Sequence, residues 1–148
     1  MIRVLVVEDS ATAREHITAI LNGDPEIEVV GEATDGVEGV EQAARLKPDV
    51  ITMDIKMPRM DGHEATRQIM ATTPTPIVVV TSVTRQEMVH EGLDVLLLGA
   101  LEIVQKPSTI TTQSYEAISE ELLAKVKAVS GIAVQGSSRK PASRNAQR

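Results

Sequence analysis

The chain has 148 residues, of which 42% are hydrophobic, and it contains one Tyr but no Phe, Trp or Cys. This length suits one domain with an aliphatic core, and the lack of cysteine excludes disulfides, thiolate chemistry and cysteine-ligated zinc. The net charge of −6 argues against a nucleic-acid-binding face. Because no signal region and no apolar run of roughly 20 residues is present, we expect a cytoplasmic protein that binds no membrane.

Apolar runs alternate with helical patterns in the first half of the chain. Residues 3–7 predict a strand, Ser10 is placed to cap the helix that follows, and residues 28–33 predict a second strand. Residues 36–46 predict a second helix. The side chains expected to face the core from these two helices are Ala13, Ile17, Ile20, Leu21, Val37, Val40, Ala43 and Ala44.

The second half of the chain repeats this alternation. Residues 50–53, 77–81 and 101–104 predict strands, and helices are expected over 63–72 and 85–98. The last helix is expected to bury one face, which is formed by Tyr115, Ile118, Leu122, Val126 and Val129. Repeated alternation of strand and helix predicts an α/β fold, with a doubly wound parallel sheet of five strands and helices on both faces.

The composition changes after residue 129. Residues 130–148 contain no acidic residue and four basic ones, which are Arg139, Lys140, Arg144 and Arg148. We therefore predict one domain over residues 1–129, followed by a flexible basic linker or tail over 130–148. A basic arm that contacts nucleic acid or an acidic surface is the less favoured alternative.

Carboxylates follow the first and third predicted strands. Glu8 and Asp9 come directly after the first strand, and Asp54 comes directly after the third. Ligands bind at the carboxyl edge of open parallel sheets, and three carboxylates crowded there are unfavourable without a hard cation. We therefore predict a Mg²⁺ site made of Glu8, Asp9, Asp54 and the backbone carbonyl of Lys56. The alternatives are a solvated acidic pair and an Asp54 that only caps its loop.

A hydroxyl and an ammonium follow the fourth and fifth predicted strands. Thr81 can donate to a phosphoryl oxygen, with Ser82 as a rival donor, and Lys106 can neutralise a carboxylate at rest and a phosphoryl oxygen after transfer. Together with a carboxylate nucleophile and a metal, these groups are suited to in-line phosphoryl transfer onto Asp54. Because an acyl phosphate is labile in water, the chemistry favours a reversible switch over a metabolic step.

These residues resemble the motifs of receiver domains in two-component response regulators. The matching motifs are Glu8-Asp9, Asp54 followed by Met57-Pro58 and Asp61-Gly62, Thr81, and Lys106-Pro107. The resemblance covers about residues 1–129 and implies a flavodoxin-like fold with strand order 2-1-3-4-5 and five helices. It also implies Mg²⁺ held by Glu8, Asp9 and Asp54, and phosphorylation of Asp54 by a histidine kinase. Thr81 and Lys106 would bind the phosphoryl group, and the Lys106–Pro107 bond would be cis.

A narrower resemblance links the chain to the regulatory half of CheB-type chemotaxis methylesterases. It rests on residues 4–11, 24–31, 46–50, 74–82 and 122–129. In that family a linker joins the receiver to a catalytic domain that removes methyl groups from chemoreceptor glutamates. The resemblance implies such an output domain, and this chain, which holds none of the esterase machinery, would then be a piece of a longer protein. Whether the parent protein is an enzyme stays open, as do a stand-alone receiver and a receiver for another output domain.

One position departs from the receiver pattern. Receivers usually carry an aromatic residue three positions before the lysine, and Ile103 stands there in this chain. Because Ile103 has no aromatic ring that could change position on activation, we expect the signal to pass through Thr81 and residues 82–86. An output domain or partner protein would then contact the 82–104 face. Residues 92–98 are apolar enough to be either core or an exposed patch.

Two other classes of function fit the sequence less well. A small Mg²⁺-dependent aspartyl phosphatase would also use Asp54 as its nucleophile. Such enzymes typically carry a second acid two residues later, where this chain has Lys56. A flavin-binding module on the same fold is disfavoured because Glu8 and Asp9 would repel the flavin phosphate, and no Trp or Phe is available to stack on the ring.

Overall fold

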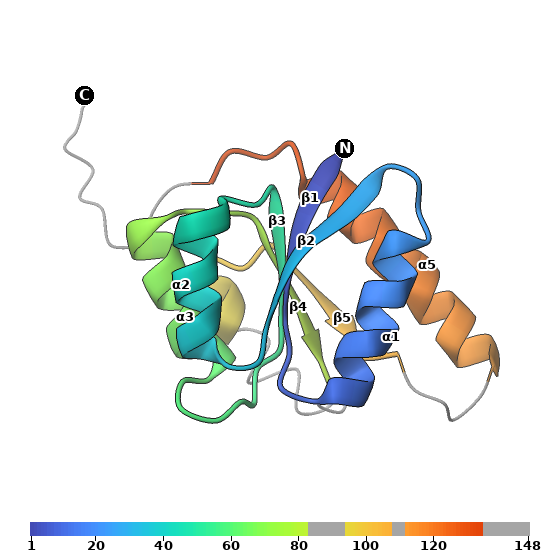
Figure 1. The fold of residues 1–148 in the computed structure, drawn as a ribbon, viewed down its shortest axis with the longest axis horizontal. Helices are drawn as coiled ribbons and strands as arrows, with labels where there is room; N and C mark the ends of the chain where they lie inside the picture. The colour runs from blue at the N-terminus through green and yellow to red at the C-terminus, as the bar shows by residue number, and fades with distance from the viewer. Residues whose placement is uncertain (83–93, 108–111, 135–148) are drawn as a thin grey trace.

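Five parallel strands form the centre of the computed structural model, which describes residues 1–82, 94–107 and 112–134 (Figure 1). The strands are β1 (Ile2–Val7), β2 (Ile27–Ala33), β3 (Val50–Met53), β4 (Ile77–Thr81) and β5 (Glu102–Gln105). Each neighbouring pair is parallel, and the order across the sheet is β2-β1-β3-β4-β5. The predicted flavodoxin-like sheet is confirmed, and each predicted strand lies within one residue of its observed bounds.

Helices cover both faces of this sheet. α2 (Gly36–Leu46) and α3 (Gly62–Thr72) lie on one face, and α1 (Ala11–Asn22) and α5 (Thr112–Val129) lie on the other (Figure 1). Residues 94–97 are also helical and form the described end of the helix predicted over 85–98, whose other residues except Leu98 lie outside the described ranges. The Ser10 hydroxyl caps α1 as predicted, because it accepts a hydrogen bond of 3.3 Å from the Ala13 N–H. Of the helices that the structure describes, none combines the length and the hydropathy needed to cross a membrane.

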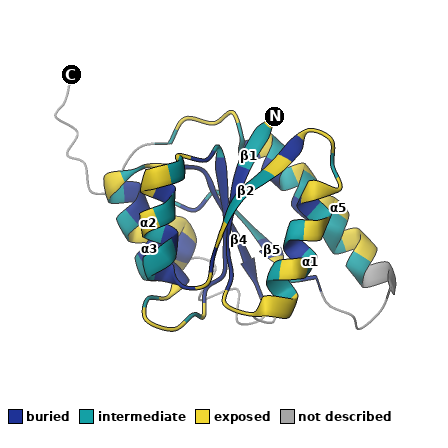
Figure 2. Ribbon diagram, in the orientation of Figure 1, coloured by how far each residue is buried: buried dark blue, intermediate teal, exposed yellow. Residues whose placement is uncertain are grey.

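The sheet divides the aliphatic core into two clusters (Figure 2). Leu5 and Val7 belong to the cluster that packs against α2 and α3, which we call the α2–α3 cluster. Val4 and Val6 belong to the cluster that packs against α1 and α5, the α1–α5 cluster. Because successive residues of a strand face opposite sides, a strand covered on both faces is apolar along most of its length. This explains why β1, β3 and β4 lack a polar alternation.

The prediction for the buried face of α2 is wrong at Ala44, which is exposed. The other predicted inward positions of α1 and α2 are at least half-buried. The fully buried residues of α2 are Gly36, Gly39 and Ala43. These residues lie three and four positions apart and form one stripe of small residues, with Gly39 against Val7. The helix rotates to bring this stripe onto the sheet, and Ala44 then faces solvent.

The chain after α5 crosses to the opposite face of the sheet. The Ile132 N–H donates to the Val129 carbonyl over 2.9 Å, and Val134 packs against the α2–α3 cluster. In Figure 1 this segment runs from the end of α5 toward α2 and α3. Residues 130–134 therefore contact the domain that we predicted to end at residue 129. The flexible linker remains a prediction, and residues 135–148 lie outside the described part of the chain.

Truncation of a core leucine tests this packing. Leu122 is 0% exposed in the α1–α5 cluster, and we expect Leu122→Ala to lower the free energy of unfolding by about 3 kcal/mol, because it removes buried methyl groups and leaves a cavity. Leu97 is 75% exposed, and Leu97→Ala is the matched control, with an expected change below about 0.5 kcal/mol. Urea denaturation measures both values, and equal losses in the two variants would contradict the assignment of the core.

Candidate phosphoacceptor and metal site

The carboxyl ends of four strands meet at one edge of the sheet. Glu8 follows β1, Asp54 follows β3, Thr81 ends β4 and Lys106 follows β5. Backbone hydrogen bonds continue the ladder past the strand ends. The Asp54 N–H donates to the Val7 carbonyl (3.0 Å), and the Lys106 N–H donates to the Thr81 carbonyl (2.8 Å). The register of the sheet therefore sets the positions of these side chains.

Three carboxylates gather at this edge, at the positions that the sequence indicated. One oxygen from each of Glu8, Asp9 and Asp54 lies within 4.8 Å of the others. Glu8 and Asp54 are 1% and 4% exposed, whereas Asp9 is exposed. Oε1 of Glu8 is buried and has no hydrogen-bond partner among the described residues. Since a buried oxygen without a partner is unfavourable, and Mg²⁺ prefers carboxylate ligands, this donor set fits a magnesium ion.

The ammonium of Lys106 contacts two of these carboxylates. Its Nζ lies 2.9 Å from Oε2 of Glu8 and 3.2 Å from Oδ2 of Asp54. The Lys106 side chain is largely buried, so water screens these contacts poorly. One ammonium faces three acids, and the ionised site therefore keeps an excess of negative charge.

Burial changes the protonation of this site. It raises the pKa of Glu8 to about 7, against the hydrogen bond from Lys106, and the nearby Asp54 charge raises this pKa further. Burial also raises the pKa of Asp54, although the charge of Lys106 opposes the change. Burial alone would lower the pKa of Lys106, but its hydrogen bond to Glu8 and the charge of Asp54 outweigh that effect, and this pKa is raised. The two buried acids are thus held in water-poor surroundings that favour their neutral forms.

The loop after Asp54 is closed at its base. Oδ1 of Asp54 accepts a hydrogen bond of 2.8 Å from the Ile55 N–H. The Gly62 N–H donates to the Ile55 carbonyl over 2.6 Å, which joins the two ends of the loop. A Cβ atom at residue 62 would overlap the Asp54 carbonyl oxygen, so the close approach requires glycine. Lys56, whose carbonyl we expect to bind the metal, is exposed in this loop.

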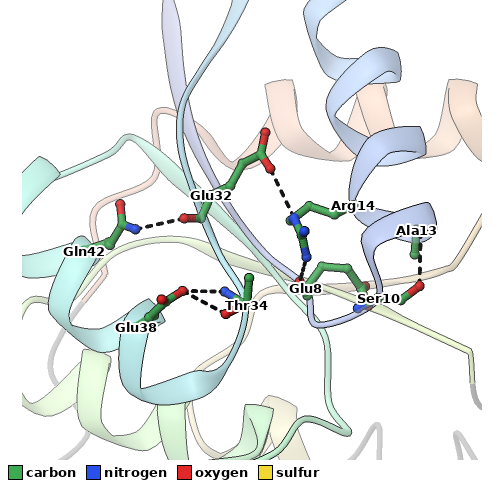
Figure 3. A network of polar contacts seen from close by, with 8 residues as sticks. All are labelled: Glu8, Ser10, Ala13, Arg14, Glu32, Thr34, Glu38 and Gln42. Carbon is green, nitrogen blue, oxygen red and sulfur yellow. Dashed lines mark hydrogen bonds and ion pairs between the residues drawn. The ribbon is translucent and has the colours of Figure 1, made fainter.

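Arg14, which no sequence motif singles out, supports the turn that carries the acidic pair. Its guanidinium donates to the Glu8 carbonyl (2.8 Å) and to Oε1 of Glu32 on β2 (3.1 Å), as Figure 3 shows. The Ser10 N–H donates to Oε2 of Glu8 over 3.1 Å. From the sequence alone, an arginine at this position in a helix is expected to be an ordinary surface residue. Its role in the site depends on the contact with β2, which the sequence pattern does not predict.

Two expectations at the other end of the site have different outcomes. Thr81 is buried and its rival Ser82 is exposed, and the role of Thr81 remains a prediction. The expected cis bond between Lys106 and Pro107 is wrong, because the described residues contain no cis peptide bond. Trans is the lower-energy isomer before proline by about 0.5–1 kcal/mol, and Lys106 reaches both carboxylates with a trans bond.

The 82–104 face carries exposed leucines at its described end. Val95 is core, whereas Leu96 and Leu97 are exposed, so residues 92–98 supply both core and surface, and Gly92 and Leu93 lie outside the described ranges. Ile103, in place of the usual aromatic residue, is half-buried and packs against the α2–α3 cluster.

The fold and this edge define a receiver domain. A family model of the response regulator receiver domain matches residues 4–114, and the chain belongs to this family.

The chain is also similar to a particular group of receivers. It is 47% identical over 133 residues to "Protein-glutamate methylesterase/protein-glutamine glutaminase 4" of Myxococcus xanthus, across 90% of this chain and 37% of the relative. A methylesterase/glutaminase of Symbiobacterium thermophilum is 50% identical over 127 residues, across 86% of this chain and 35% of the relative. The response regulator domain of Thermotoga maritima CheB has a TM-score of 0.81 and 40% identity, across 90% of this chain and 98% of that chain. The resemblance to CheB-type receivers is confirmed, and the chain spans little more than a third of these curated relatives.

The raised pKa of Glu8 predicts that the metal-free protein loses stability as pH rises. Between pH 4.5, the usual pKa, and about pH 7, the folded protein retains a proton that the unfolded chain has released. The free energy of unfolding therefore falls through this window, by on the order of 2 kcal/mol, and is level above it. Urea denaturation in EDTA from pH 5 to pH 8 measures the change.

Glu8→Gln provides the control for this titration. The variant lacks the ionisable group of Glu8, so the fall should be shallower, with only the contribution of Asp54 left, and the variant should be more stable than wild type above pH 7. Parallel pH curves for the two proteins would show that Glu8 does not titrate in this range.

Proposed function

We propose that the chain accepts a phosphoryl group from a histidine kinase on Asp54 and acts as a switch for an output domain. Mg²⁺ would be held by Glu8, Asp9, Asp54 and the Lys56 carbonyl. The observation that carries this proposal is the meeting of three carboxylates with the Lys106 ammonium at one edge of the sheet. Membership of the receiver family supports the kinase, the metal and the cytoplasm as the expected compartment.

Asp54 is the proposed nucleophile. A carboxylate oxygen of Asp54 attacks phosphorus and forms a P–O bond as the P–N bond to the kinase histidine breaks. The electron pair leaves with the imidazole nitrogen, which takes a proton from solvent. The Ile55 N–H, 2.8 Å from Oδ1, orients the carboxylate for this attack.

Charge neutralisation provides most of the proposed catalysis. A bound Mg²⁺ would shield the negative charge of the incoming phosphoryl group. Lys106, already 3.2 Å from Oδ2 of Asp54, would bind one phosphoryl oxygen, and the Thr81 hydroxyl would donate to another. Because a carboxylate is ionised at neutral pH once a metal offsets its neighbours, no general base is needed.

The output domain is proposed from the relatives. The similar proteins are methylesterases/glutaminases about three times as long as the matched segment, and this supports a protein-glutamate methylesterase domain beyond the receiver. Leu96 and Leu97 give the 82–104 face an apolar element for such a partner. The gene sequence beyond the codon for Arg148 tests this point directly, and a stop codon there would favour a stand-alone receiver.

Chemical phosphorylation tests the acceptor. With Mg²⁺ and acetyl phosphate, intact mass spectrometry should show a single phosphoryl adduct, which Asp54→Asn and EDTA each abolish because they remove the nucleophile or the metal. Asp61→Asn is the control, since Asp61 caps α3 in the same loop and Asn preserves a cap. Loss of the adduct in this control as well would mean that the loop rather than Asp54 is responsible. Turnover of unrelated phosphomonoesters would instead favour the phosphatase.

Replacement of Lys106 should separate metal binding from phosphoryl transfer. In Lys106→Ala the site loses its ammonium, so Mg²⁺ should bind at least roughly threefold more tightly at pH 8. The rate of adduct formation should fall by at least about tenfold, because the group that would bind a phosphoryl oxygen is missing. An NMR titration measures the first effect, and mass spectrometry over time measures the second. A parallel loss of both would indicate that Lys106 maintains the structure of the site and does not bind the phosphoryl group.

A further inference from the structure

The tip of the loop after Asp54 has an unfavourable backbone conformation. Arg59 has φ of 66°, in the left-handed region that residues with a Cβ atom seldom adopt. The Met60 N–H donates to the Pro58 carbonyl over 2.7 Å, so the chain turns sharply around Arg59. A strained turn of this kind persists where the surrounding structure holds it.

Asp35 holds the Arg59 side chain. Nε of Arg59 donates to Oδ2 of Asp35 over 2.8 Å, and the Asp35 side chain is only 10% exposed. The other oxygen, Oδ1, accepts from the Glu38 N–H over 2.9 Å and so caps α2. Hydrogen bonding from Arg59, together with the cap, keeps the pKa of Asp35 below its usual value. One carboxylate therefore joins the loop tip to the start of α2.

A backbone contact lies beside this ion pair. The Gly36 N–H donates to the Met60 carbonyl over 3.0 Å, and a Cβ atom at residue 36 would overlap that carbonyl. Adjacent residues of the loop, Arg59 and Met60, thus contact adjacent residues at the start of α2, the N-cap Asp35 and Gly36. The loop is fastened at its base by Gly62 and at its tip by α2, with Lys56 between these two points.

We propose that Asp35 and Arg59 are positioning residues for the metal. By fixing the loop tip on α2, the pair limits the movement of the Lys56 carbonyl and so increases the affinity of the site for Mg²⁺. This inference rests on the proposed function, because it assumes that Mg²⁺ binds among Glu8, Asp9 and Asp54. Neither residue of the pair contacts the metal or the phosphoryl group.

Substitutions at residue 59 separate the ion pair from the backbone turn. Arg59→Gly removes the guanidinium, and glycine adopts φ of 66° without strain, so the turn can be kept. Asp35→Asn removes the charge from the other side and preserves a good N-cap for α2. Each variant is titrated with Mg²⁺ and followed by amide chemical shifts, and its free energy of unfolding is measured by urea denaturation in EDTA.

We expect Mg²⁺ to bind roughly three- to fivefold more weakly in Arg59→Gly and in Asp35→Asn, as for loss of one well-aligned ion pair. The double variant should bind about as weakly as either single variant, because both remove the same contact. Arg59→Lys should restore part of the affinity. Arg67→Ala is the matched control, since it breaks an exposed ion pair with Glu64 within α3 and should leave Mg²⁺ binding unchanged.

The outcomes distinguish this inference from the proposed function. Wild-type Mg²⁺ affinity in both single variants, with or without a loss of stability, would make the pair purely structural and overturn the inference while leaving phosphorylation of Asp54 intact. If the wild-type chain itself binds no Mg²⁺, the proposed function and the inference both fail. Should Arg59→Gly not fold, Asp35→Asn decides the question alone.

Discussion

Two carboxylates and an ammonium are buried together at the edge of an aliphatic sheet, and the remaining properties of the domain depend on holding them there. Removal of Glu8 and Asp54 from water is unfavourable, and the raised pKa of each acid reflects it. The ammonium of Lys106 compensates only part of this desolvation, since one cation serves two buried acids. The same imbalance that weakens the metal-free domain is one that a divalent cation would offset.

The backbone maintains this arrangement. Glu8 and Lys106 are 98 residues apart in the chain and come into contact because β1 and β5 belong to one parallel sheet. Ladder bonds past the strand ends place Asp54 and Lys106, and Gly62 lets the following loop return close to Asp54. Since the sheet fixes these positions, a core without Phe or Trp is sufficient to support the site, and Ile103 packs against the α2–α3 cluster where receivers usually carry an aromatic residue.

The strands and the acidic cluster could be predicted because each rests on a local pattern. A strand buried on both faces is continuously apolar, and it ends where Glu8, Asp54 or Thr81 begins the site. Contacts between distant parts of the chain leave no such pattern. Arg14 and Glu32 are 18 positions apart, and Asp35 and Arg59 are 24 positions apart. Ala44 is exposed because packing of Gly39 against Val7 sets which face of α2 lies on the sheet. The prediction of a cis bond at Pro107 came from the resemblance to the family and not from the residues of this chain, and it was wrong.

Residues 130–134 pass from α5 to the face of the sheet that α2 and α3 cover, and this path sets the point from which the following chain leaves the domain. Lys127, near the end of α5, pairs with Asp24 ahead of β2, so the chain leaves from the end of the sheet opposite Asp54. β1 is six residues long, and the two ends of the sheet are therefore about 20 Å apart. A domain attached beyond Val134 would need a span of roughly six extended residues to reach the Asp54 end of the sheet, or would have to lie along the flank of the receiver. Contact between the receiver and such a domain would then depend on the length of the connecting segment as much as on the chemistry of either surface.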